Sequence, residues 1–113
     1  ADAARITPDL VAGFTPLRRR IVARLGALLE PGTALLLPTV PCIAPRKDAP
    51  AAEIGEFYRR ALTLTCGAGH AGLPQLSLPL AETEGCPLGL SIVGPRGSDA
   101  SLLAVAAAHT AAA

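Results

Sequence analysis

Six residues in the second half of the chain spell a phosphate-binding pattern. Residues 67–72 read G-x-G-x-x-G, which in dinucleotide-binding folds follows a strand and opens a helix, so that backbone N–H groups meet the pyrophosphate. Here a helical pattern precedes the glycines, and Leu73-Pro74 and a strand pattern follow them. We therefore favour a helix stop with a tight passage into a strand, and keep a nucleotide-binding site as an alternative.

The cysteines and histidines do not form a metal-binding pattern. Cys42, Cys66 and Cys86 are an odd number without a Cys-x-x-Cys pair, and His70 and His109 lie far apart in the sequence. A metal site needs three or four converging ligands, so we predict no metal and no other cofactor. We interpret Cys66 as a small buried hydrophobe and favour the same for Cys42, with a reactive thiol as the alternative at Cys42 if a cation lowers its pKa. Unpaired thiols favour a reducing setting, and we expect a cytoplasmic protein.

No segment predicts a complete apparatus for nucleophilic catalysis. The sequence lacks a G-x-S-x-G elbow and places no serine beside a plausible base. The single lysine, Lys47, stands in a proline-rich loop that we expect to be exposed. A lysine that acts as a base must lose its proton near neutral pH, which requires burial. We therefore predict no catalytic residue in this chain.

Basic residues cluster in one place only. Residues 18–20 are three arginines, with Arg24 one turn further, and they have no interleaved aromatic residues. With a formal net charge of +1, we interpret them as a solvated helix face and expect no nucleic-acid partner. Arg96, ahead of Ser98, could bind an anion at a helix N-terminus; because Asp99 is itself an anion there, we favour a self-capped helix.

Length and composition indicate one ordered unit. The 113 residues are 50% hydrophobic and 17% charged, with a mean hydropathy of +0.43, which excludes intrinsic disorder. No apolar run approaches the ~18 residues of a membrane span, so we expect no membrane partner. The chain begins with Ala1 and contains no Met. Removal of an initiator and excision from a longer protein both explain this, and both stay open.

Hydrophobic periodicity predicts six elements in the order α-β-α-β-β-α. Apolar residues three and four apart indicate helices, alternation indicates half-buried strands, and one continuous apolar run suits a strand covered on both faces. The predicted helices are residues 8–30, 52–65 and 98–106, and the predicted strands are residues 34–37, 75–80 and 88–93. The last two strands form an antiparallel pair, with Pro79 confined to a strand end or edge.

Three segments, taken in this order, resemble one family. They are residues 35–41 (LLLPTVP), residues 65–79 (TCGAGHAGLPQLSLP) and residues 85–94 (GCPLGLSIVG). Together with Ser98-Asp99 and the leucines that follow, they resemble the C-terminal part of the amidase signature family. The resemblance extends over residues 9–109, and the loops at 41–45 and 94–99 look most like those of bacterial indole-acetamide hydrolases.

This resemblance implies a fold class and an activity. Residues 1–113 would be the C-terminal part of an amidase signature domain, an α/β segment of a mixed-sheet fold that is incomplete on its own. Such enzymes hydrolyse carboxamide C–N bonds to a carboxylic acid and ammonia, using a nucleophilic Ser, a bridging cis-Ser and a Lys. That glycine- and serine-rich signature is absent here and Lys47 does not match it, so we expect this chain alone to be inactive.

By the same resemblance, this chain would contribute one wall of the acyl pocket for a small amide substrate. The candidate residues are Thr39, Val40, Pro41 and Cys42 in the loop, and Gly69 and His70 at the helix-strand passage. A sheet without its neighbours exposes edges and an apolar face, so a homo-oligomer is possible. The alternative from another class is a free-standing, non-catalytic small α/β interaction module.

Overall fold

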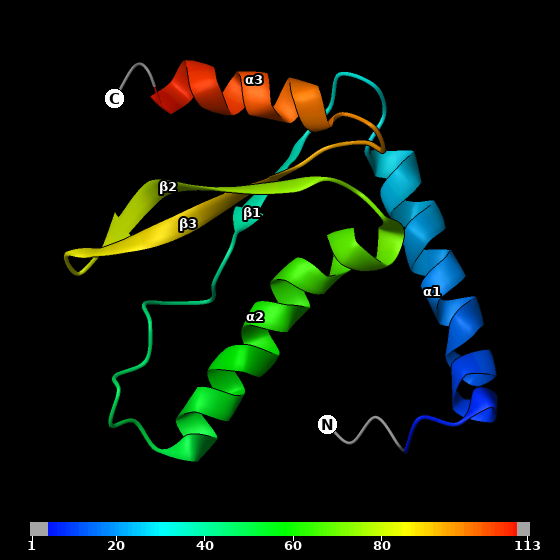
Figure 1. The fold of residues 1–113 in the computed structure, drawn as a ribbon, viewed down its shortest axis with the longest axis horizontal. Coiled ribbons are helices and arrows are strands. Elements are labelled where there is room, and N and C mark those ends of the chain that lie inside the picture. Colours follow the sequence, from blue (N-terminus) through cyan, green and yellow to red (C-terminus); the bar gives the residue numbers. More distant parts are fainter. Residues whose placement is uncertain (1–4, 111–113) are drawn as a thin grey trace.

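The structure, a computed structural model, describes residues 5–110 and has the predicted element order (Figure 1). The elements are α1 (Pro8–Leu28), β1 (Leu35–Pro38), α2 (Ala51–Ala71), β2 (Gln75–Thr83), β3 (Cys86–Val93) and α3 (Asp99–Thr110). The α/β class is therefore confirmed. None of the helices in this described part is long and apolar enough to cross a membrane.

Strand β3 is the centre of a small antiparallel sheet. The strand order is β1-β3-β2, and β3 pairs antiparallel with both neighbours. The predicted β2–β3 pair is confirmed, with Ser77 opposite Ser91. The register shifts between Leu78 and Ala81, where Pro79 has no N–H to donate. Since β2 is an edge strand of the described sheet, Pro79 stands where a proline is tolerated.

A different helix lies on each side of the sheet, as Figure 1 shows with α3 above the sheet and α2 below it. On one side a buried cluster joins the sheet to α3; its members are Leu78, Ile92, Leu102 and Ala106. On the other side Leu29, Ala68 and Val93 are buried together, with Leu37 and Leu73 packed against them. Alternation along β3 therefore sends Ile92 towards α3 and Val93 towards α2.

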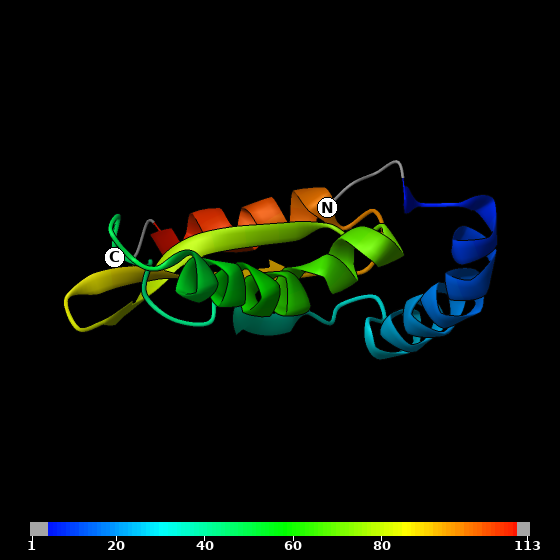
Figure 2. The same cartoon turned by 90° about the horizontal axis from the view of Figure 1, so that it is seen from below.

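The apolar stripe predicted for the first helix forms but is not covered. Helix α1 begins after Thr7, whose Oγ1 accepts a hydrogen bond from Leu10 N at 3.3 Å, and contains no buried residue. Phe14 is 64% exposed and Leu10 48%. The molecule is a flat slab, 50 × 43 × 18 Å (Figure 2), with a radius of gyration of 16.7 Å. A compact domain of this length has a radius of about 13 Å.

Strand β1 differs from its prediction in the same way. Its continuous apolar run predicts cover on both faces, but Leu35 and Leu36 are exposed and only Leu37 is half-buried. The strand pairs through β3 alone within the described residues. Leu35 is 43% exposed and Leu36 59%, so residues 5–110 cover these two side chains only in part.

The prediction that helix α2 ends near Thr65 is wrong. The helix continues through Gly67 and Gly69 to Ala71 and ends at Gly72, which has a left-handed φ of +63°. Only this last glycine stops the helix, through N–H groups that return to the carbonyls of the preceding turn. The other glycines of the G-x-G-x-x-G run are part of the helix, not a phosphate-binding turn.

Two arginines hold the last carbonyls of α2. Arg96 Nη2 donates to Ala71 O at 2.7 Å, and Arg18 Nε of α1 donates to His70 O at 3.3 Å. These bonds satisfy acceptors that a helix end leaves open, and they place positive charge at the negative end of its dipole. Arg96 thus binds the C-terminal end of α2, a contact that was not predicted from the sequence.

Two thiol predictions are also wrong. Cys66 was expected to be buried, but the extended α2 turns it to solvent, and Cys42 is exposed as well. Both are free thiols, as is the half-buried Cys86.

We expect Gly72→Ala to lower the melting temperature of the chain. A Cβ there would lie 2.9 Å from Arg96 Nη2, in a backbone conformation that disfavours alanine by roughly 1–2 kcal/mol. Gly55→Ala is the matched control, because Gly55 is helical with open space around its Cβ position; that change should stabilise by up to about 1 kcal/mol. Thermal unfolding followed by circular dichroism measures both. Equal shifts in the two variants would contradict this account of the helix end.

Candidate functional site

A row of hydroxyl groups crosses the sheet on the face that looks towards α2. Thr39, just after β1, has its Oγ1 2.7 Å from Ser77 Oγ of β2 and 2.7 Å from Ser91 Oγ of β3. Gln75 Nε2 donates to Ser91 Oγ at 2.9 Å. Ser91 is completely buried, so its hydroxyl depends on these partners for all its hydrogen bonds.

The order of donors in this row follows from the burial of Ser91. Its oxygen accepts from Gln75, and among the described residues Thr39 Oγ1 is the acceptor for its proton. Thr39 Oγ1 and Ser77 Oγ share the last hydrogen bond of the row, in which either hydroxyl can be the donor. The row ends at Ser77, which is exposed.

Gly89 makes room for the row. A Cβ at this position would lie 2.6 Å from Ser77 Oγ and 2.8 Å from Thr39 Oγ1, closer than real side chains approach. The backbone of Gly89 also accepts a hydrogen bond from Thr39 N at 2.8 Å, which continues the β1–β3 pairing by one residue. Glycine is thus required here by close approach.

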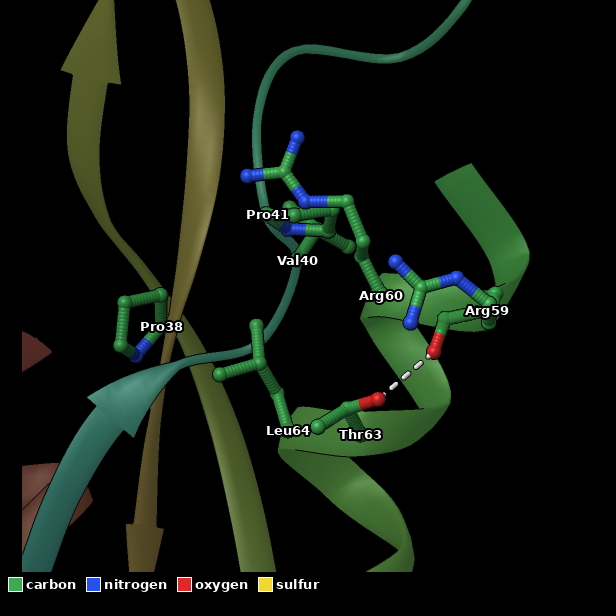
Figure 3. Close-up of a pocket in the computed structure, with 7 residues that line it drawn as sticks. All are labelled: Pro38, Val40, Pro41, Arg59, Arg60, Thr63 and Leu64. Carbon is green, nitrogen blue, oxygen red and sulfur yellow. Dashed lines mark hydrogen bonds between the residues drawn. The ribbon is translucent and has the colours of Figure 1, made fainter. Parts of the chain in front are cut away.

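The next two candidate residues line a cavity of about 400 Å³ beside this row. Val40 and Pro41 form its loop side with Pro38, while residues of α2 form the other side (Figure 3). In that view Arg60 and Leu64 point from the helix towards the loop. The α2 residues are Arg59, Arg60, Thr63 and Leu64. The loop after β1 therefore joins a hydrogen-bonded row to an open pocket.

Cys42 lines a neighbouring cavity of about 300 Å³ that also includes Arg60. Between the two cavities, Glu56 and Arg59 form an ion pair of 2.6 Å, three residues apart on α2. Arg60, four residues after Glu56, is also at a helical pairing distance, but the ion pair in the structure joins Glu56 to Arg59. The hydrogen bond from Arg59 holds the pKa of the Glu56 carboxyl below its ordinary value of 4.5.

Gly69 and His70 lie elsewhere, at the C-terminal end of α2. They line a cavity of about 570 Å³ with Arg18, Arg19 and Arg96. The six candidate residues thus form two groups. One group, Thr39 to Cys42, borders the middle of α2, and the other borders its end.

Sequence reasoning missed three polar members of the hydroxyl row. Gln75 and Ser77 share one face of their alternating strand, and Ser91 shares that face on the paired strand. The sequence pattern that could have predicted this row is a serine on each of the two paired strands, at positions that face each other among mostly apolar residues. Lys47 is exposed, as predicted. Among residues 5–110, no group of three or more His, Cys, Asp or Glu is placed to hold a metal ion.

Known proteins share this arrangement of strands and helices. The family model described as Amidase matches residues 14–103. Amidase 1 of Oryza sativa subsp. japonica is 37% identical over 92 residues, covering 81% of this chain and 21% of that protein. An indoleacetamide hydrolase of Pseudomonas syringae pv. syringae is 41% identical over 66 residues, covering 58% of this chain and 14% of that protein.

Solved structures agree with the sequence comparisons. A crystal structure of an amidase superposes with a TM-score of 0.72 at 30% sequence identity, covering 91% of this chain and 25% of that one. The α-β-α-β-β-α segment is thus an amidase-type fold, and the chain belongs to the amidase family. It spans about a fifth of the length of the relatives it matches.

We expect Ser91→Ala to destabilise the chain by about 1–3 kcal/mol, since it leaves the half-buried side chains of Gln75 and Thr39 without this hydrogen-bond partner. Ser77→Ala is the control at the exposed end of the same row, and should cost less than about 1 kcal/mol. Urea unfolding of the two variants measures the difference. A larger loss for Ser77→Ala would contradict the order of donors given above.

The ion pair on α2 predicts a pH dependence. A depressed carboxyl pKa stabilises the fold above the ordinary value of 4.5, and the contribution is lost as pH falls through the folded-state pKa. In an NMR titration, Arg59→Gln should raise the pKa of Glu56 more than Arg60→Gln does, because Arg59 supplies the hydrogen bond and Arg60 only a weaker coulombic effect. An equal rise in both variants would show that the hydrogen bond is unimportant.

Proposed function

We propose that this chain is the C-terminal part of an enzyme that hydrolyses the C–N bond of small carboxamides to a carboxylic acid and ammonia. The observation that carries the proposal is the amidase family match over residues 14–103. Relatives that bear the name amidase or indoleacetamide hydrolase support this class of reaction. The fraction of each relative covered supports a larger parent enzyme.

The reaction requires a nucleophile and a base that come from outside residues 1–113 under this proposal. A serine assisted by a cis-serine and a lysine would attack the amide carbonyl, ammonia would leave, and water would release the acid from the acyl-enzyme. The exposed position of Lys47 supports a base from elsewhere, because a lysine that acts as a base needs a buried environment.

The role of this chain would be to form one wall of the acyl pocket. Val40 and Pro41 line an open cavity of about 400 Å³, and pockets of this size accept small organic ligands. The hydroxyl row ends nearby in Ser77, whose proton can be donated to a carbonyl oxygen. Pro38, Val40, Pro41 and Leu64 give this cavity an apolar part that suits the acyl group of an amide, and Arg59, Arg60 and Thr63 form its polar part.

We further propose a cytoplasmic enzyme that associates with itself. The three free thiols support a reducing compartment. Exposed apolar side chains support association, among them Leu36 and Leu62.

An ammonia-release assay tests the activity. We expect the purified 113-residue chain to release no ammonia from alkyl or aryl carboxamides, and the full protein encoded around it to do so. Its coding sequence should continue upstream of Ala1 into a glycine- and serine-rich stretch. Turnover by the isolated chain at the rate of a whole amidase would contradict the proposal that the nucleophile and the base come from outside residues 1–113. A start codon directly before Ala1 would favour the non-catalytic module instead.

Filling the cavity tests the pocket wall. In the full protein, Val40→Phe should lower kcat/KM for bulky amides by about tenfold, because the larger side chain takes up room for a few carbon atoms of the substrate. Val105→Phe is the matched control, because Val105 lies on α3, is 45% exposed and lines none of these cavities. Equal effects of the two substitutions on kcat/KM would show that Val40 does not line the substrate pocket.

A further inference from the structure

The cavity at the C-terminal end of α2 is lined by positively charged side chains from segments far apart in the sequence. It has a volume of about 570 Å³, and its polar walls are Arg18 and Arg19 of α1, His70 of α2 and Arg96 of the loop before α3. In Figure 1 these three segments come together near the C-terminal end of α2. No Asp or Glu of the described residues lines it.

Two of these guanidinium groups are held in place. Arg96 Nη2 is bound to Ala71 O, and Arg18 Nε is bound to His70 O. Each bond uses one N–H donor, so the other donors of the guanidinium fork remain for a ligand in a fixed orientation. Preorganised donors of this kind lower the entropic cost of binding an oxyanion.

The helix end does not neutralise the cluster. The C-terminus of a helix carries about half a negative charge, whereas three arginines line this cavity. The ion pairs within the described residues join Arg46 to Asp48 and Arg59 to Glu56, away from this cavity. A net positive potential therefore remains inside it, of the kind that attracts carboxylate or phosphate groups.

An apolar cavity of about 500 Å³ adjoins the charged one. The two share Thr15, Arg18 and His70, and the apolar walls come from Leu10, Val11 and Phe14 on α1. One face of α1 therefore changes from apolar to cationic within two turns. A ligand that fits both cavities has an anionic head and an apolar body.

We propose that this pair of cavities binds a small amphipathic organic anion. Its carboxylate or phosphate head lies among Arg18, Arg19 and Arg96, and its apolar body lies against Leu10 and Phe14. The site is separate from the pocket beside Val40, and the proposal does not depend on amide hydrolysis.

Calorimetric titration of the protein with four probes tests the site. Octanoate and octyl phosphate carry head and body, whereas acetate and inorganic phosphate carry only the head. We expect the better octyl probe to bind at least about tenfold more tightly than its head alone, since burying two methylene groups provides that much. The preferred octyl probe identifies the head group as carboxylate or phosphate. Failure of both octyl probes to bind saturably would overturn the proposal.

Variants locate the bound ligand. Arg19→Gln should weaken binding of the preferred octyl probe about fivefold, as one partly exposed charge contact predicts. Arg20→Gln is the matched control, because it removes the same charge from the next residue, which does not line the cavity. If both substitutions weaken binding of the octyl probe equally, the effect comes from the net charge of the protein and not from a contact in the cavity, and the proposed site is wrong.

The apolar half has its own variant. Phe14 is 64% exposed, so Phe14→Ala should leave the fold intact and weaken the octyl probe without changing the binding of the head alone. Circular dichroism checks that the variants are folded. If Phe14→Ala leaves octyl binding unchanged and instead dissolves a dimer in analytical ultracentrifugation, the apolar face is an interface between copies, and the proposal is wrong.

Discussion

The buried hydroxyl of Ser91 is the constraint on which the arrangement of the sheet depends. A polar group with no exposure must find its partners inside the protein. Here they come from both neighbours of β3: Gln75 from β2, and Thr39 from the end of β1. A slip of one residue in either pairing would turn the partners to the opposite face. The hydrogen bonds of one side chain therefore fix two strand registers, and Gly89 keeps the space that they need.

The elements could be predicted because each is encoded by a local pattern. Alternation between residues 75 and 93 places polar and apolar side chains on opposite faces, and the structure has that hairpin. Thr7 and Pro8 mark the start of α1 in the ordinary way. The family could also be recognised from the order of three short segments, each of which contains proline.

What could not be predicted depends on contacts between distant residues. Glycines at 67 and 69 are poor helix formers, and a local analysis ends α2 before them. The helix nevertheless continues, because Arg18 and Arg96 bind its last carbonyls and Leu25 packs 3.7 Å from where a Cβ of Gly67 would lie. The exposure of Cys66 follows from the same six extra residues. Tertiary contacts thus outweigh local propensity at this helix end.

The length of α2 also explains why the candidate residues separate into two groups. A helix of 21 residues is about 30 Å long. The loop with Val40 meets it at Arg60 and Leu64, near its middle, while His70 lies at its last turn. A single small substrate cannot contact both places, since even an extended ligand would have to cross the Thr63–Ala68 segment that packs against Leu37 and Val93. Two separate cavities, one between the loop after β1 and the middle of α2 and one at the end of α2, are therefore better explained by two ligands than by one.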